Sequence, residues 1–522
     1  MSWYIEIFLV LFISGYYIAR SSKSKKLPPL PPGPPGLPIL RNLLDIPTSF
    51  EWETYGKWAD EYGPIVSASA FGATIVVVNQ YKAAVKMLAD SQKGAIYSSR
   101  PFIPMAFLMG WENAMAFTPY GPRFRKYRQV FHEEMGNTKS IQSYWPQEVA
   151  HARHFVKLCT ETPERLMEHC FQHAGAIVLR VAYGYVAKDH DDEFVEAGNV
   201  AMKSFNEGCT PGAYMVNNLP ILQHVPEWVP GAGFQKVARL GRPLFGNMVD
   251  TPFNFVKREL AAGTAEDSFT AKWLKKGLSE EDEDILRYAS GSMFGGGGET
   301  TAITVHTFFL AMTLYPDIQQ KAQKEIDAVL GGHRLPTVED RDNLPYLEAL
   351  TKEVLRVNPA VPNGMLYLPT ACPPAVLRFN YWLTGLPHCT TEDDIHEGYF
   401  IPKGSIVITN IWKMLRDPQV YPNPEKFNPD RFLGPNPEPS PRDALFGFGR
   451  RVCPGRLLAD ISVFITLATC LAVLNVSPVI EDGKPVLPEM KSEGGAVNRL
   501  LPFKCKITPR FDRKTLEAMT KE

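Results

Sequence analysis

One short loop near the C-terminal end constrains this chain more than any other segment. Residues 446–455 read Phe-Gly-Phe-Gly-Arg-Arg-Val-Cys-Pro-Gly, which places Cys453 among three glycines and a proline before an apolar stretch that begins at Leu457. Glycine lets the backbone approach a flat ligand and aim N–H groups at one sulfur. A thiolate is a strong, electron-donating metal ligand. A lone cysteine is more often a buried thiol, so the surrounding loop has to support the functional interpretation.

Composition favours one large enzyme domain. The chain has 522 residues, of which 45% are hydrophobic, and this is enough for a sizeable core. A net charge of -1 provides no basic surface for nucleic acid. The eight cysteines form no Cys-x-x-Cys pair, which argues against a zinc cluster and a disulfide scaffold. We therefore expect a catalytic domain in a reducing, cytosol-facing compartment.

Residues 1–22 are predicted to form a single-pass transmembrane anchor. The apolar run from Trp3 to Ala19 would span about 26 Å as a helix, near the thickness of an endoplasmic reticulum bilayer. Basic residues follow it, at positions 20, 23, 25 and 26, and the positive-inside rule keeps this flank cytoplasmic. The alternative is a cleaved signal peptide, but such a signal normally carries its charge before the apolar stretch.

A basic and proline-rich hinge is expected at 23–45, and a single domain at 46–522. The prolines between 28 and 38 make a stiff spacer, with an SH3 ligand as the alternative. The domain is expected to open with a helix at 51–62 and strands at 65–69 and 74–79. The alternation from Gly398 to Asn410 predicts a β-hairpin.

Two further patterns precede the cysteine loop. Gly295–Gly298 are followed by Glu299 and Thr300 inside a long apolar helix, predicted at 284–314. Each glycine costs about 1 kcal/mol against alanine in a helix, so we expect an interruption there for passage over a ligand. Glu353 and Arg356 lie three apart on another helix, and the bland alternative for them is a surface salt bridge.

The segment 446–455 resembles the haem-binding signature of the cytochrome P-450 family, with Cys453 as the proximal iron ligand. The resemblance extends in order over the chain after the anchor. It implies a mainly α fold with a small β region, and haem b as cofactor, contacted by Phe446, Arg451 and Gly455. Residues 295–301 resemble the family's oxygen-binding motif, which makes Thr300 the hydroxyl that orders water and Glu299 the carboxylate that relays protons.

The resemblance also assigns supporting residues. Arg128 and His388 are expected to bind the haem propionates. The family carries a tryptophan four residues before this arginine, but Phe124 stands here and cannot donate a hydrogen bond, so we expect weaker haem retention. Glu353, Arg356 and Arg431 are expected to form a buried cluster that serves folding and haem incorporation.

The implied activity is that of a membrane-anchored monooxygenase, similar to fungal microsomal enzymes of secondary metabolism. It would insert one atom of O₂ into a lipophilic small molecule such as a terpenoid, polyketide or indole. Electrons would come from a separate NADPH-cytochrome P-450 reductase, with cytochrome b5 as a further candidate donor. Membrane lipid is an expected partner and nucleic acid is not. The alternatives are a haem-thiolate isomerase or dehydratase and a non-catalytic haem-binding protein; Glu299 and Thr300 argue against both.

Three segments are expected around the substrate pocket. In the family, the loop at 101–117 roofs the pocket and the apolar, proline-rich segment at 219–234 lies where the protein meets the membrane. The turn at 492–499 would reach back into the pocket.

Residues 364–384 do not fit the resemblance. Family members read Asn-Pro-x-x-Pro-x-Gly-Leu-Pro-His, but here 21 residues separate Asn363 from Gly385. The codons of residues 364–365 can carry a splice donor and those of 384–385 an acceptor, and removal of 63 nucleotides restores the pattern in frame. We predict a retained intron and a functional protein of 501 residues. The alternative is a family-specific insertion that shapes the substrate site.

Overall fold

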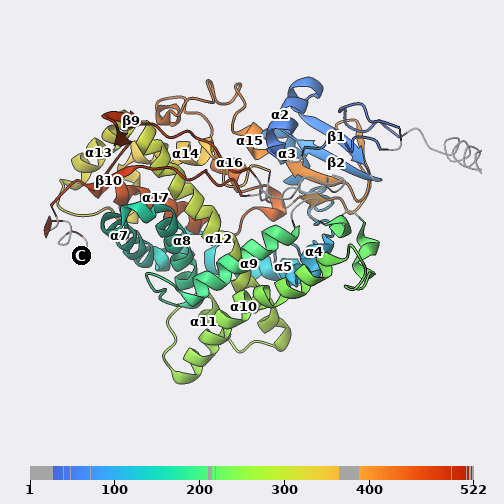
Figure 1. Cartoon of the computed structure of the whole chain (residues 1–522), viewed down its shortest axis with the longest axis horizontal. Helices are drawn as coiled ribbons and strands as arrows, with labels where there is room; N and C mark the ends of the chain where they lie inside the picture. Colours follow the sequence, from blue (N-terminus) through green and yellow to red (C-terminus); the bar gives the residue numbers. More distant parts are fainter. Residues whose placement is uncertain are drawn as a thin grey trace, which may run out of the picture.

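The computed structural model describes residues 27–38, 40–47, 49–70, 72–209, 214–217, 219–363, 387–494, 497–512, 514–515 and 519. The predicted anchor at 1–22 and the suspect segment at 364–384 lie outside these residues. Helices dominate the described part, as predicted (Figure 1). They are α2 (Glu51–Tyr62), α3 (Tyr81–Leu88), α4 (Pro104–Leu108), α5 (Pro122–Met135), α6 (Thr138–Ile141), α7 (Trp145–Glu161), α8 (Leu166–Tyr183), α9 (Glu193–Cys209), α10 (Gly233–Ala262), α11 (Phe269–Leu274), α12 (Glu280–Leu314), α13 (Pro316–Leu330), α14 (Pro345–Val357), α15 (Ile411–Met414), α16 (Arg442–Leu445) and α17 (Arg456–Val473).

The main sheet is small and lies beside α2 and α3, away from the helical bulk, whereas β9 and β10 lie near α13 and α17 (Figure 1). This sheet has the order β1-β2-β6-β3, in which β2 and β6 are parallel and the other pairs antiparallel. The remaining strands form three two-stranded ladders, β4 with β5, β7 with β10 and β8 with β9. The strands are β1 (Ile65–Ala70), β2 (Ala73–Val78), β3 (His388–Cys389), β4 (Asp394–His396), β5 (Tyr399–Ile401), β6 (Ile406–Thr409), β7 (Leu474–Ser477), β8 (Val479–Glu481), β9 (Lys484–Val486) and β10 (Lys506–Pro509).

The hairpin predicted from Gly398 to Asn410 is wrong. Strand β5 pairs with β4, whereas β6 joins the main sheet. The turn between β4 and β5 consists of Glu397 and Gly398, which both have positive φ, at 50° and 85°. Two such residues form the tight turn that suits antiparallel strands, so the hairpin closes at Glu397 and Gly398, between β4 and β5, instead of between β5 and β6.

Helix α12 is the central element, packed against α5, α8, α10 and α17. The interruption predicted at its glycines is wrong, because the helix is continuous. Close packing explains two of the glycines. A Cβ on Gly297 would lie 2.8 Å from the Val178 side chain of α8, and one on Gly291 would lie 2.7 Å from Val249 of α10. At Gly296 and Gly298 a Cβ would meet no atom within 4 Å, so the helix surface is open at both positions, which lie on nearly opposite sides of the axis.

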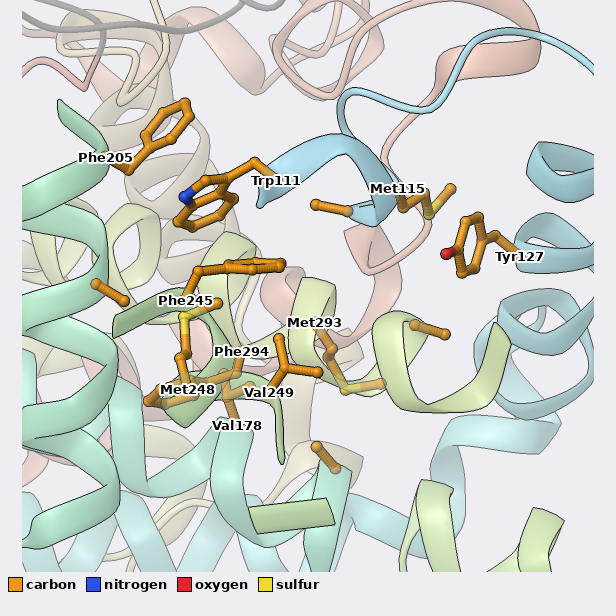
Figure 2. Close-up of a cluster of buried hydrophobic side chains, with 14 of the residues drawn as sticks. Trp111, Met115, Tyr127, Val178, Phe205, Phe245, Met248, Val249, Met293 and Phe294 are labelled. Atoms are coloured by element: carbon orange, nitrogen blue, oxygen red, sulfur yellow. The ribbon is translucent and has the colours of Figure 1, made fainter. Parts of the chain in front are cut away.

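Aromatic side chains join the loop after α4 to the helices that cover α12. Figure 2 shows Trp111 against Phe205 of α9 and Phe245 of α10, near Met293 and Phe294 of α12. The ring centroids of Trp111 lie 4.5 Å from Phe205 and 4.3 Å from Phe245. Aromatic pairs at such distances stabilise beyond the area they bury. The predicted roof segment is therefore held against α9 and α10 by apolar contacts.

Helix α17 is, among the described residues, the one helix long and apolar enough to cross a membrane. In the fold it is a core helix, because 78% of it is buried inside the protein. Its neighbours include α7, α12 and α13. It begins at Arg456, directly after the cysteine loop, which places its N-terminal end beside Cys453.

Candidate active site

The cysteine loop has a backbone that only glycine allows. Gly447 and Gly449 have φ of 75° and 57°. A Cβ on Gly449 would lie 2.1 Å from the carbonyl oxygen of Leu88, at the end of α3, so a larger residue would displace the loop. The backbone N–H of Cys453 donates to the carbonyl oxygen of Phe446 over 2.8 Å, which closes the loop.

The sulfur of Cys453 lies in a mixed environment. Burial raises the pKa of this thiol, while the backbone N–H of Gly455 and the cations Arg128 and Arg456 lower it. A Cβ added to Gly455 would meet no atom within 4 Å, so the space beside this residue is open. The N-terminus of α17 favours negative charge at the same place. The loop therefore presents a thiol that donors can hold as a thiolate once a metal replaces its proton.

Four basic side chains gather beside this loop: Arg100, Arg128, His388 and Arg451. Burial, with repulsion from Arg100 and Arg128, lowers the pKa of Arg451 to about 8. Burial lowers the pKa of Arg100 to about 10. Within the described residues neither Arg128 nor Arg451 forms an ion pair with a carboxylate; they donate to backbone carbonyls instead. Such a cluster is costly unless an anion joins it.

His388 on β3 completes this basic cluster. Its Nδ1 lies 2.7 Å from the carbonyl oxygen of Tyr97. Burial and the nearby charges of Arg100 and Arg451 hold the pKa of His388 well below its usual range. The strand pairs with β6 at Val407, so the main sheet sets the position of the ring.

Phe124 supports Arg451 instead of donating a hydrogen bond. The guanidinium carbon of Arg451 lies 3.5 Å from the centroid of the Phe124 ring, a cation–π contact. Nε and Nη2 of Arg451 donate to the carbonyl oxygens of Ser98 and Thr118, each over 2.7 Å. Arg128 donates to the carbonyl oxygen of Val452, next to the cysteine. The two arginines therefore hold the cysteine loop against α5 and the segment before it.

These residues fit a haem. Its iron requires the soft, electron-donating ligand that the Cys453 loop presents, and its two propionates are anions that can pair with Arg128 and Arg451. The open sides of Gly455 and Gly296 leave the backbone without side chains in the way. The sequence placed Cys453, Arg128, His388 and Arg451 in one site, and in the structure they lie together.

The two oxygen-site residues predicted on α12 point to different sides. The hydroxyl of Thr300 donates to the carbonyl oxygen of Gly296, 3.0 Å away on the open side. Glu299 is buried and forms an ion pair with Arg499, in the C-terminal turn. Consecutive helical residues are about 100° apart around the axis, which accounts for the separation.

The expected ion cluster is present, and its three side chains are buried. Arg356 donates to both carboxylate oxygens of Glu353, over 2.8 and 2.9 Å. Arg431 donates to one of these oxygens over 3.2 Å and also pairs with Glu438. The backbone N–H of Asn428 adds a further bond to Glu353. These partners compensate the buried carboxylate, and the surface salt bridge that was the alternative is excluded by the burial.

Comparison with known proteins decides the family. The sequence profile of the family described as Cytochrome P-450 matches residues 31–368 and 375–507. The chain belongs to the cytochrome P-450 family. It is 41% identical to cytochrome P-450 monooxygenase 208 of Postia placenta, over 90% of this chain and 88% of that one. It is also 41% identical to cytochrome P-450 monooxygenase claR of Ampulloclitocybe clavipes, over 90% and 85% respectively.

A solved cytochrome P-450 has the same fold. The zebrafish cytochrome P-450 in complex with abiraterone matches with a TM-score of 0.67 at 22% identity, over 88% of this chain and all of that one. Membership of the family makes the protein a haem-thiolate monooxygenase, an oxidoreductase that incorporates oxygen from O₂ and depends on a redox partner and a lipophilic substrate.

Two residues at this site were not assigned a role from sequence. Arg100 donates to the carbonyl oxygens of Ala116 and Pro387 and lies beside His388. Its signal was a lone arginine before a proline, at the start of the predicted roof segment. Arg499 pairs with Glu299, and its signal was the polar end of a turn expected to reach into the pocket.

Proposed function

We propose that Cys453 is the proximal iron ligand and that Arg100, Arg128, His388 and Arg451 hold the propionates of haem b. The observation that supports this assignment most is the buried basic cluster beside a glycine-bounded thiol. Phe446 and Gly455 contribute backbone to the loop that carries the sulfur. Bound haem supplies the iron that activates O₂; the chain's residues hold it, exclude water and deliver protons.

Thr300 and Glu299 are proposed to serve the oxygen chemistry from α12. The Thr300 hydroxyl lies on the open side of the helix at Gly296, where it can hold a water molecule for proton delivery. Glu299 is the nearest carboxylate in sequence and supplies protons. The Glu353, Arg356 and Arg431 cluster is proposed to serve folding and haem incorporation.

The substrate is proposed to be a lipophilic secondary metabolite. The segments above α12 contribute aromatic and methionine side chains, which suits an apolar guest (Figure 2). The fungal origin of the relatives is consistent with such a role. The test is conversion of candidate terpenoids, polyketides and indoles by the chain with its reductase under ¹⁸O₂. A product that carries one labelled atom supports oxygen insertion; a rearranged product without label, formed without NADPH, would favour an isomerase or dehydratase.

The protein is proposed to be anchored in the endoplasmic reticulum membrane by residues 1–22, with the hinge at 23–45 and a cytoplasmic catalytic domain at 46–522. Two apolar side chains of the 219–234 segment, Ile221 and Trp228, are 73% and 82% exposed, which suits contact with lipid. NADPH-cytochrome P-450 reductase is the proposed electron donor, with cytochrome b5 as a second one. Extraction of membranes with carbonate tests the anchor, because an integral protein stays in the pellet.

We also propose that the functional form lacks residues 364–384. The family profile does not match residues 369–374. Before the segment, the carbonyl oxygen of Pro362 accepts a hydrogen bond from the N–H of Trp412. After the segment, His388 pairs with Val407, which lies only five residues from Trp412 in the chain. Four residues would then join the flanks, with a reach of about 18 Å. Asn363 is buried, and neither end of its side chain has a hydrogen-bond partner among the described residues.

Sequencing of the mature transcript tests this proposal, together with expression of the 501-residue and 522-residue forms. We expect a message without the 63 nucleotides and a 501-residue form that retains haem better. A message that keeps them, together with a shortened form that loses activity, would show that the segment belongs to the enzyme.

A further inference from the structure

The ion pair between Glu299 and Arg499 uses only one of the two carboxylate oxygens. Arg499 Nε donates to Oε1 over 2.6 Å, and Nη2 contacts the same oxygen. Oε2 is buried and has no hydrogen-bond partner within the described residues. Glu299 itself is only 8% exposed. A buried acceptor without a partner is unfavourable, because it has lost its hydrogen bonds to water.

An acidic cleft leads from the surface to Glu299. Its volume is about 950 Å³, and Glu299 lines it together with Gly295, Gly298 and Arg499, opposite residues of α8 and α9. Carboxylates outnumber cations along its walls; those on the α9 side are Asp191, Asp192, Glu193, Glu196 and Glu207. Thr300 does not line this cleft, because its hydroxyl lies on the Gly296 side of α12. Glu299 therefore lies between the cleft and the oxygen side of the helix.

The turn that carries Arg499 is fixed to α12 at a second point. The side-chain amide of Asn498 donates to Asn358 Oδ1 over 2.6 Å, and that of Asn358 donates to Thr307 Oγ1 over 2.9 Å. All three side chains are buried. The backbone N–H of Asn498 also donates to the carbonyl oxygen of Ala360. Arg499 is thus anchored relative to the helix that it serves, although its own side chain is 35% exposed.

We propose that Arg499 is a positioning residue, which fixes Glu299 so that Oε2 accepts protons from the acidic cleft. This inference rests on the proposed function of Glu299 and Thr300. Oε2 takes one proton from a hydronium ion in the cleft and gives one to a water molecule on the Thr300 side. Glu299 returns to the carboxylate, and the step consumes no oxidant or reductant.

The test follows the fate of O₂ in the full-length holoenzyme with its NADPH-dependent reductase and no added substrate. Reduction to peroxide takes two electrons and two protons, whereas reduction to water takes four of each. Consumption of NADPH and O₂ and release of peroxide are therefore measured together. We expect Arg499→Gln to raise the fraction of O₂ released as peroxide about threefold or more, because proton delivery falls behind.

Matched variants separate position from charge. Arg499→Lys, which keeps a cation, should restore most of the native peroxide fraction. Asn498→Ala keeps the Arg499 side chain but removes the side-chain hydrogen bond to Asn358. It should raise the peroxide fraction less than Arg499→Gln does. Arg510→Gln removes another C-terminal arginine, which pairs with Asp327 of α13 and not with a residue of α12. This variant should leave the peroxide fraction unchanged. An unchanged fraction in Arg499→Gln overturns the inference.

A double-mutant cycle on thermal unfolding gives a readout independent of turnover. Arg499→Gln, Glu299→Gln and the double variant should be non-additive, because the two side chains act as a pair. Additive effects contradict the pair itself. If the native protein consumes no NADPH while the variants remain non-additive, the ion pair exists but the proposed function is refuted, and the role of the pair in proton delivery is refuted with it.

Discussion

The guanidinium carbon of Arg451 lies over the ring of Phe124, 3.5 Å from its centroid, and the guanidinium donates to three backbone carbonyl oxygens. The family resemblance alone indicates that Phe124 replaces a tryptophan and that a hydrogen-bond donor is lost. In the structure the same residue is a platform that holds one member of the basic cluster in place. A cation over a buried aromatic ring contributes about 2 kcal/mol, more than a surface contact.

Phe124→Leu should therefore speed haem loss and lower the melting temperature of the holoprotein. Leucine keeps the apolar volume but has no ring to face Arg451. Phe124→Trp keeps the ring and adds an N–H donor, so its haem loss should be slower than that of Phe124→Leu. Transfer of haem to apomyoglobin measures both rates. Equal rates in the two variants would show that Arg451 does not depend on the ring.

Thr300→Ala should keep haem but release more of the reduced oxygen as peroxide. Its hydroxyl lies on the open side of α12, and alanine cannot hold a water molecule there. Thr304→Ala, one helical turn later, is the matched control, because its hydroxyl also donates to the carbonyl oxygen four residues earlier. Peroxide released per NADPH is the measurement. The same value in the native protein and in Thr300→Ala would remove Thr300 from proton delivery.

Glu148→Gln should stabilise the protein at pH 8. Glu148 on α7 is 1% exposed, and burial raises the pKa of its carboxyl from 4.5 to about 8. Because the folded state binds the proton more tightly than the unfolded state, stability falls as the pH rises from about 4.5 to 8. Glutamine removes that loss, about 4–5 kcal/mol for such a shift. Unfolding at pH 5 and pH 8 checks this, and an unchanged difference between the two pH values would contradict it.

The sequence predicted those parts of the site that depend on local patterns. The glycines around Cys453 and the helix that follows are local features, and both are present. The bounds of α2 match the prediction because its apolar spacing and its flanking residues agree. Strand pairing was less predictable: β5 could pair forward or backward, and the conformation of Glu397 decided it.

Contacts between distant segments could not be predicted from one sequence. The glycines at 295–298 suggested an interruption because their cost was visible, whereas the packing partner of Gly297, Val178, lies on another helix. The pairing of Glu299 with Arg499 joins residues 200 positions apart. The role of Phe124 likewise depends on Arg451, which is remote in sequence and adjacent only in the fold.

The carbon monoxide difference spectrum of reduced membranes tests the central assignment most directly. The native chain and Cys389→Ala, a control cysteine that is also only partly buried, should both give the thiolate-type band. Cys453→Ala should give none, because no other described cysteine has a comparable glycine loop. Retention of the thiolate-type band in Cys453→Ala would contradict the account.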